Sequence, residues 1–296
     1  MRLNKYISHN SKYSRRDADK LIEAGEITVN KKKITEFGYD VKDEDHISVK
    51  GVPIKERTEL TMIVYNKPKG TLVTKKDDRG RTTIYHKLSG KFRHFLPVGR
   101  LDYASEGMLI MTDSPKVADI MMRSGLDRTY NLKIDKPLSS EMEEAMREGL
   151  FLDDARAGGH EKSKIYSMDF EPFINYDIRG VTPNFTKLRV TIAEGKNREL
   201  RRFFGHFDAK ILDLKRVAFG GIELNNLPTN KTRYFTRKEY DELHKYLKAI
   251  VKLEAQEKKE EQDRINAEKL KEKRLTDKNF EEKPNRVKPK SKKYKK

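Results

Sequence analysis

Apolar residues between positions 60 and 194 recur at alternate positions or in short runs, a pattern typical of β-strands. Many of these segments alternate apolar and polar residues, so we expect a mixed, mainly antiparallel sheet with one face toward helices. The strand-like segments are LTMIVYN (60–66), GMLIMT (107–112), TYNLKI (129–134), YSMDF (166–170) and KLRVTIAE (187–194).

Helical spacing of apolar residues appears between these strands. It predicts helices in SPKVADIMM (114–122), SSEMEEAMREGL (139–150) and RELRRFFGHF (198–207). Strands that run in series with helices between some of them indicate an α+β fold. We therefore predict one domain over residues 60–247, a sheet flanked by helices.

The first 58 residues have a different pattern. Leu3, Tyr6 and Ile7 have helical spacing, and Ser14 precedes a second helical segment in which Asp17 completes a capping arrangement. Gly25 is a plausible stop for that helix. Short strand-like segments follow at ITV (27–29) and HISV (46–49), so residues 1–58 predict a small α/β domain.

The last zone, residues 250–296, has few apolar residues and many helix formers, and it ends in KPNRVKPKSKKYKK. This composition predicts a solvated helix that frays into a disordered basic arm. Such an arm is either a tail without function or a segment that binds phosphate groups independently of the nucleic-acid sequence.

Charge narrows the range of partners. The 65 Lys and Arg residues outnumber the 47 Asp and Glu residues, for a formal net charge of +18. This balance favours a polyanionic partner, nucleic acid first and an anionic membrane surface second. Basic residues cluster in the first zone, where they predict an RNA-contacting face: Arg15, Arg16, Lys20, Lys31, Lys32 and Lys33.

Several classes of site are excluded or not indicated. The chain has no cysteine, which excludes disulfides and a thiol nucleophile. Its seven histidines show no compact ligand spacing and no phosphate-binding glycine motif is present, so we expect no metal and no cofactor. No apolar run approaches the roughly 18 residues of a membrane helix, and no signal peptide is visible, so we expect no membrane partner and a cytoplasmic location.

One carboxylate stands out. Asp102 lies in GRLDYASEGMLIMTD (99–113), a segment whose apolar residues suit burial. An unpaired buried charge is costly, so Asp102 needs a reason to be there. A carboxylate between a glycine turn and an apolar strand is either a structural cap or a catalytic group, and the residues alone favour the cap.

Two further segments combine basic residues with chain breaks. In KPKG (67–70) a strand must turn, and Lys67 lies at that turn either in a plain surface loop or in an RNA contact. In EGKNRELRRFFGHF (194–207), Arg198, Arg201 and Arg202 are spaced to share one helix face. Arginines at a helix start commonly bind phosphate or pair with a carboxylate.

Taken together, these segments resemble a known family. The order is K-P-x-G, then LPVGRLDYASEGMLIMTD (96–113), then a strand with a tyrosine, then G-x-N-R-x-[LV]-R-R. This arrangement resembles the bacterial ribosomal RNA pseudouridine synthases that begin with an S4-type RNA-binding domain. LNKYISHNSKYSRRDADKLIEAGEITVNKK in the first zone resembles the S4-type domain, and the resemblance covers about residues 1–240.

The resemblance implies an activity and residue roles. Enzymes of this family isomerise uridine in RNA without a cofactor, by detaching the base from C1′, rotating it and rejoining it through C5. Asp102 matches the catalytic aspartate, Arg201 the arginine that pairs with it, and Tyr130 the tyrosine that packs on the target base. Arg100 matches a residue that binds phosphate or fills the space left by the flipped base. Leu200 takes an apolar position beside the pocket, and Glu199 departs from the glutamine common in the family.

We therefore predict an isomerase that modifies ribosomal RNA, 23S in preference to 16S because of the Lys-rich tail. The RNA is free or part of a pre-ribosomal particle, and the enzyme is expected to be a monomer. The alternatives are a non-catalytic RNA-binding or ribosome-assembly protein and, outside RNA modification, a DNA-binding protein. The predicted catalytic residues are Asp102, Tyr130 and Arg201, and the predicted RNA-binding residues are Arg100, Arg15, Arg16, Lys20, Lys31, Lys32, Lys67, Arg198 and Arg202.

Overall fold

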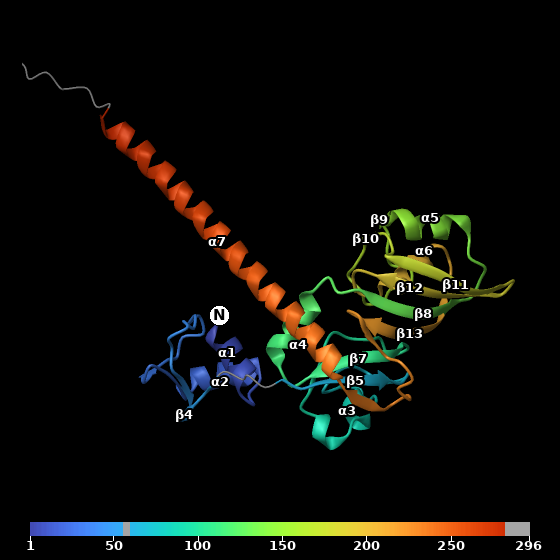
Figure 1. Cartoon of the computed structure of the whole chain (residues 1–296), viewed down its shortest axis with the longest axis horizontal. Coiled ribbons are helices and arrows are strands. Elements are labelled where there is room, and N and C mark those ends of the chain that lie inside the picture. Colours follow the sequence, from blue (N-terminus) through green and yellow to red (C-terminus); the bar gives the residue numbers. More distant parts are fainter. Residues whose placement is uncertain (56–59, 282–296) are drawn as a thin grey trace, which may run out of the picture. The chain divides into compact units, whose positions relative to one another are not determined.

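A computed structural model of the chain describes residues 1–55 and 60–281, and the side chains of this range except those of 254, 258 and 267–281. Its contacts divide the chain into two compact units, Met1–Glu239 and Tyr240–Lys296. The first unit contains both the small N-terminal sheet and a large mixed sheet (Figure 1).

The N-terminal zone packs two helices and a four-stranded antiparallel sheet around one core. Ser14 accepts a hydrogen bond from the Asp17 backbone N–H while Asp17 accepts one from that of Ser14, which confirms the predicted capping arrangement. Gly25 follows α2 with a φ of +64°, a left-handed conformation that favours glycine. The elements are α1 (Leu3–Asn10), α2 (Arg15–Glu23), β1 (Ile27–Val29), β2 (Lys32–Lys33), β3 (Ile47–Val49) and β4 (Val52–Pro53), in the sheet order β2-β1-β3-β4.

The large sheet has the strand order β11-β12-β8-β13-β7-β5-β15. Its neighbouring strands are antiparallel except for β13 and β7, which are parallel, so the predicted mixed, mainly antiparallel sheet is confirmed. Two further short strands, β6 and β14, each pair with one strand of this sheet, β6 with β7 and β14 with β13. The strands are β5 (Met62–Lys67), β6 (Leu96–Pro97), β7 (Glu106–Thr112), β8 (Arg128–Ile134), β11 (Asn175–Thr182), β12 (Phe185–Ile192), β13 (Ile211–Phe219), β14 (Ile222–Glu223) and β15 (Thr232–Tyr234).

Two strand predictions were incomplete. The predicted strand 166–170 lies in a separate two-stranded sheet, where β10 (Met168–Phe170) pairs with β9 (Leu150–Leu152). The predictions also missed β11 and β13, although β13 lies in the middle of the large sheet. β13 carries Asp213, Lys215 and Arg216 among its apolar residues, and this charge hides the strand pattern.

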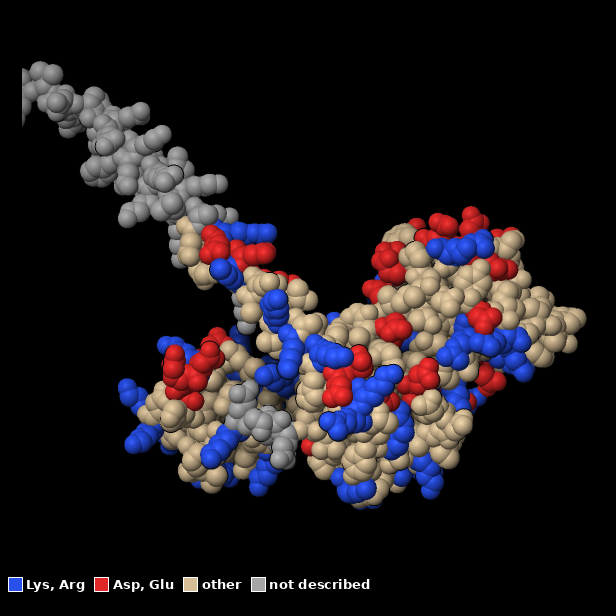
Figure 2. Space-filling model, in the orientation of Figure 1, with Lys and Arg blue, Asp and Glu red and all other residues tan. Residues whose placement is uncertain are grey.

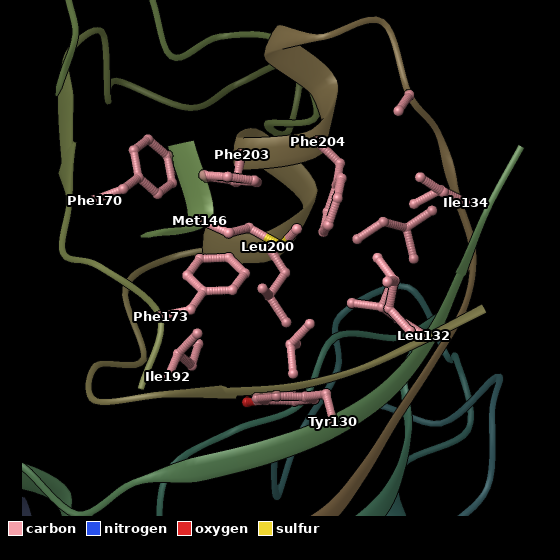
Figure 3. Packing of buried hydrophobic residues seen from close by; sticks show 14 of the residues in the cluster. Tyr130, Leu132, Ile134, Met146, Phe170, Phe173, Ile192, Leu200, Phe203 and Phe204 are labelled. Carbon is pink, nitrogen blue, oxygen red and sulfur yellow. The ribbon is translucent and has the colours of Figure 1, made fainter. Parts of the chain in front are cut away.

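Helices cover one face of the β8–β12 half of the sheet. Leu132 and Ile134 of β8 and Leu188 and Val190 of β12 point to the same core as helices α5 (Ser140–Glu148) and α6 (Glu199–His206) (Figure 3). Because β12 alternates buried and exposed residues, its other face stays open to solvent.

The central strands β5 and β7 are buried almost along their whole length, unlike the alternating strands predicted. Ile63 and Tyr65 of β5 pack with Leu109 and Met111 of β7 under α3 (Ile84–Lys87). The remaining helical elements of this unit are η1 (Gly90–Phe92) and α4 (Pro115–Arg123). A strand covered on both faces reads as a continuous apolar run, which explains GMLIMT.

The described residues of the second unit lie in α7 (Arg237–Glu281), a single helix of 45 residues. It confirms the predicted solvated helix, although the helix begins before residue 250. The predicted disordered basic arm lies in 282–296, outside the described residues. Within the described part of the chain, no helix is long and apolar enough to span a membrane.

The two halves of the large sheet meet where β7 and β13 approach each other closely. Gly107 has a φ of +101°, and a Cβ on this residue would lie 2.2 Å from the backbone oxygen of Arg216. A side chain at position 107 would therefore push apart the parallel pair next to Asp102.

We expect Gly107→Ala to lower the free energy of unfolding by about 2 kcal/mol or more, because the residue needs a left-handed backbone and has no space for a Cβ. Urea unfolding measures this loss. Gly90→Ala is the matched control, since a Cβ there meets nothing within 4 Å. Equal stability of the two variants would contradict the close approach.

Candidate active site

Asp102 lies in the loop between β6 and β7 rather than within a strand. Gly99 adopts a φ of +74°, and nothing lies within 4 Å of its would-be Cβ, so a left-handed backbone rather than close approach requires the glycine. Leu101 is buried, whereas the Asp102 side chain keeps 33% of its surface exposed. The loop therefore anchors itself through Leu101 and presents Asp102 toward solvent.

Lys67 anchors this loop through hydrogen bonds to backbone oxygens. It is fully buried, and its ammonium donates hydrogen bonds to the backbone oxygens of Pro68 (3.2 Å), Asp102 (3.1 Å) and Ser105 (2.7 Å). Burial lowers its pKa to about 8, while the Asp102 and Glu106 carboxylates act in the opposite direction. The prediction that Lys67 binds RNA is therefore wrong, because its three donors are already used within the protein.

Two arginines from the start of α6 face the Asp102 carboxylate. Arg198 Nη1 lies 3.2 Å from Asp102 Oδ2 and donates a hydrogen bond to it. Arg201 Nε lies 3.6 Å from the same oxygen. Arg198, predicted only as an RNA contact, is thus the nearer of the two guanidinium groups.

Arg201 is the more buried of these two arginines. Its side chain is 12% exposed, and it donates to the backbone oxygen of Ile211 (3.2 Å) and to Ser105 Oγ (3.4 Å). Its Nε has no hydrogen-bond partner in the described structure and points to the Asp102 side. Burial lowers its pKa and the charge of Arg198 lowers it further, while Asp102 raises it.

Arg198 also ties a distant loop to the site. It is the residue before α6 and has a left-handed φ of +52°. Its Nε donates a hydrogen bond to the backbone oxygen of Gly158 at 2.8 Å. A Cβ on Gly158 would lie 1.8 Å from the backbone oxygen of Arg201, so this loop can approach α6 only with a glycine.

Arg202 differs from Arg198 and Arg201, so the prediction that these three arginines share one helix face is wrong. It is completely buried and donates to backbone oxygens of Asn197 and Ala155 and to Ser163 Oγ. These bonds fasten the 155–163 segment to α6. Arg202 therefore stabilises the protein from within and is not placed to bind RNA.

Tyr130 lies on the core face of β8, only 8% exposed. It belongs to the same core cluster as Leu101, the neighbour of Asp102, and Leu200, the neighbour of Arg201. Figure 3 shows the Tyr130 ring below Leu200. The residues next to Asp102 and Arg201 in the sequence thus share one core with Tyr130.

An open groove lies on the arginine side of this centre. It has a volume of about 390 Å³ and is lined by Gly158, Arg198, Arg201 and Lys210, among others. A carboxylate held by two guanidinium groups beside a groove and an aromatic ring suits covalent or proton-transfer chemistry on a bound anionic polymer. Among the residues that the structure describes, no group of three or more His, Asp or Glu is placed to hold a metal ion.

The remaining predicted RNA-binding residues are on the surface. Arg100 is exposed beside Asp102, and the basic residues of the N-terminal zone are exposed and form no ion pair within the described residues. They are Arg15, Arg16, Lys20, Lys31 and Lys32. They are available to a polyanion, and their role stays a prediction.

Sequence reasoning missed the supports of the site. Ser105 is buried and links the Asp102 loop to both Lys67 and Arg201. Its signal was its place in GRLDYASEGMLIMTD, three residues after Asp102. For Gly158 no comparable signal existed, because its neighbours in space come from another part of the chain.

Glu199, the departure from the family pattern, is buried next to these groups. It is 7% exposed, and its carboxylate accepts a hydrogen bond from the Lys196 backbone N–H at 2.9 Å. Burial raises the pKa of Glu199 to about 7, although this hydrogen bond and the charges of Lys196 and Arg128 lower it. Near neutral pH this side chain is about half protonated.

Comparison with known proteins agrees with this geometry. Residues 61–206 match the family described as RNA pseudouridylate synthase, and residues 1–47 match the S4 domain. The chain belongs to the RNA pseudouridine synthase family, in the branch that carries an N-terminal S4 domain, and members of this family are isomerases.

Particular relatives cover most of the chain. It is 45% identical over 83% of its length to an uncharacterized RNA pseudouridine synthase of Helicobacter pylori, of which it covers 95%. It is 30% identical over 82% of its length to the ribosomal large subunit pseudouridine synthase B of Bacillus subtilis, again covering 95%. It is 31% identical to the dual-specificity RNA pseudouridine synthase RluF of Escherichia coli over 83% of this chain and 79% of that protein.

A solved structure shares the fold. A crystal structure of a pseudouridylate synthase superimposes with a TM-score of 0.54 at 22% identity, over 82% of this chain and 99% of that one. The chain therefore shares its fold with that synthase over most of its length.

The raised pKa of Glu199 leads to a pH-dependent stability. The stabilisation from the protonated carboxyl is present below its unfolded pKa of 4.5 and is lost as the pH rises through about 7. We expect Glu199→Gln to raise the free energy of unfolding by roughly 2 kcal/mol more at pH 8 than at pH 5. Urea unfolding at the two pH values measures this difference.

The exposed Glu161→Gln is the control and should show no such pH dependence. An equal effect of Glu199→Gln at both pH values would show that the carboxyl titrates in the folded protein as it does in the unfolded chain.

Proposed function

We propose that this protein converts a specific uridine of ribosomal RNA, in the 23S molecule, to pseudouridine, with Asp102 as the catalytic aspartate. The observation that carries the proposal is the Asp102 carboxylate, which is held by Arg198 and Arg201 next to a core that contains Tyr130. A non-catalytic RNA-binding protein would have no need of this arrangement.

The reaction breaks the bond between N1 of uracil and C1′ of the ribose and forms one between C5 and C1′. The proton on C5 leaves and N1 gains one, so no cofactor is needed. The base must leave its stack, at a cost of a few kcal/mol. Tyr130 packs against the base, and Arg100, exposed beside Asp102, offsets the cost by contacting phosphate or filling the vacated space.

Asp102 performs one of three steps: addition to the sugar, addition to the base, or removal of a ribose proton. Each requires the carboxylate to be held in place, and two guanidinium groups lie 3.2 and 3.6 Å from its Oδ2. Arg198 acts here as a positioning residue that holds the carboxylate, and Arg201 shares this role from the core side.

The choice of RNA rests on the relatives and the tail. One relative, at 30% identity, is a ribosomal large subunit enzyme, and another has dual specificity. With the Lys-rich tail this favours 23S over 16S ribosomal RNA, free or in a pre-ribosomal particle, in the cytoplasm. We also propose that the enzyme works as a monomer, with an S4-type domain over 1–58, a catalytic domain over 60–247 and a tail over 250–296.

The first test uses 23S and 16S transcripts that lack pseudouridine. We expect the parent protein to form pseudouridine in the 23S transcript and Asp102→Asn to lose at least about 10³-fold in rate, because the acting carboxylate is gone. Carbodiimide treatment followed by primer extension maps the product. The exposed Asp43→Asn controls for the loss of one acidic group.

If Asp102→Asn is as active as the parent, Asp102 is not the catalytic group. If the parent modifies only 16S RNA, the assignment to the large subunit is wrong.

The second test separates two roles of Arg198. If it positions Asp102, Arg198→Gln should lower the single-turnover rate at saturating RNA by about 10²-fold, as expected for the loss of a preorganised donor. RNA affinity should change less than about threefold, since this arginine is bound to protein groups. Arg198→Lys keeps the charge and should recover part of the rate.

Arg156→Gln, which removes an exposed arginine paired with Asp154 on the neighbouring loop, is the control. A normal rate at saturation together with weak RNA binding would instead show that Arg198 is a phosphate contact.

A further inference from the structure

The face of the large sheet opposite α5 and α6 holds a groove that the reaction described above does not use. On β8, Leu132 and Ile134 point to the core, so Asn131 and Lys133 point to the other face. Register pairs place Arg189 and Lys215 beside Asn131, and Lys187 and Asp213 beside Lys133. These residues, with Glu106 and Arg179, line a groove of about 520 Å³, which we call the open-sheet groove.

Its charge is mostly uncompensated. Asp213 pairs with Lys69, and Arg179 pairs with Asp177. In contrast, Lys133, Lys187, Arg189 and Lys215 form no ion pair with any residue that the structure describes, and the two carboxylates that lie among them are Glu106 and Asp213. Figure 2 shows the basic side chains that gather in this part of the molecule, with acidic ones between them.

The cations follow a line that starts at the catalytic loop. Glu106 is four residues from Asp102 and is paired in register with Lys215 on β13. Lys215 is paired with Asn131 on β8, and Asn131 with Arg189 on β12. Because neighbouring strands lie about 4.8 Å apart, the row crosses roughly 10 Å from Lys215 to Arg189. The row thus begins four residues after Asp102 and carries two cations, Lys215 and Arg189, with Asn131 between them.

An aromatic ring lies beside two of the groove's cations. Lys133 Nζ lies 4.0 Å from the ring centre of Phe185, and Lys187 Nζ lies 5.8 Å from it. Phe185 is half-buried, so one side of the ring stays accessible. Surfaces that bind RNA strands combine a basic groove along the backbone with aromatic rings for the bases.

We propose that the open-sheet groove binds the sugar–phosphate backbone of the substrate RNA strand next to the target uridine. This inference rests on the proposed function and extends it to a second contact surface beyond the reacting nucleotide. RNA fits better than an acidic protein segment, because an aromatic ring that can stack on a base lies beside cations that can contact phosphate. Asn131 adds a neutral donor and acceptor in the middle of the row.

The first experiment measures affinity for the unmodified 23S transcript by filter binding between about 0.05 and 0.3 M KCl, a range that brackets the 0.1 M at which the Debye length is about 10 Å. Lys187→Gln/Lys215→Gln should bind about tenfold more weakly at the lower salt, and its log Kd against log[salt] slope should fall by about 1.4, as for two lost phosphate contacts. Arg147→Gln/Lys87→Gln removes two exposed charges elsewhere and should match the parent protein.

The second experiment uses the absence of cysteine in the chain. Lys187→Cys, labelled with a photoreactive azidophenacyl group, should cross-link to nucleotides within a few positions of the modified uridine. Arg147→Cys, on the helix-covered side, should give no cross-link in that region. Primer extension on the 23S transcript locates the adducts.

The outcomes separate this inference from the proposed function. If the parent forms no pseudouridine but the groove variant still loses affinity and salt dependence, the proposed function fails and the groove remains an RNA surface. If the parent forms pseudouridine while the groove variant keeps the affinity and slope of the control, the open-sheet groove does not bind the substrate, and the inference is overturned.

Discussion

The position of the Asp102 loop depends on one buried ammonium group. Lys67 has no exposed surface, and it donates to the backbone oxygens of Asp102 and Ser105 at once. A buried cation is costly unless its donors are satisfied, so the loop cannot move away without leaving Lys67 unpaired. The same lysine ends β5, a strand that is buried along its whole length. The hydrogen bonds of Lys67 therefore attach the loop to a buried strand of the sheet.

The charged side chains near this loop differ in what they contact. The Asp102 carboxylate faces two guanidinium groups, and behind them Arg202 binds only protein groups. Arginine suits both positions because its planar group presents several donors in fixed directions and stays charged when partly buried. Three arginines within five residues therefore have three uses: one positions the carboxylate and joins a distant loop, one supports it from the core, and one fastens that loop to α6.

Local sequence patterns were sufficient to predict much of this structure. The capping residues Ser14 and Asp17 act within one helical turn, and GMLIMT is a strand because its apolar run must be buried. The pairing of Asp102 with Arg201 followed from family motifs. The destinations of Lys67 and Arg202 did not, because a basic residue looks the same in sequence whether its donors meet phosphate or backbone oxygens. β13 was missed for a related reason: its charged residues lie on a central strand whose one face is open.

The distance along the chain between the paired groups has a consequence for biosynthesis. The helices and strands of the N-terminal domain are all contained in residues 3–53, so its contacts are local and can form while the ribosome is still making the rest. The bond between Arg198 and Asp102 joins residues 96 positions apart, and β13, the neighbour of β7, follows later still. During synthesis the S4 domain can therefore fold before the residues that hold the Asp102 carboxylate have been made.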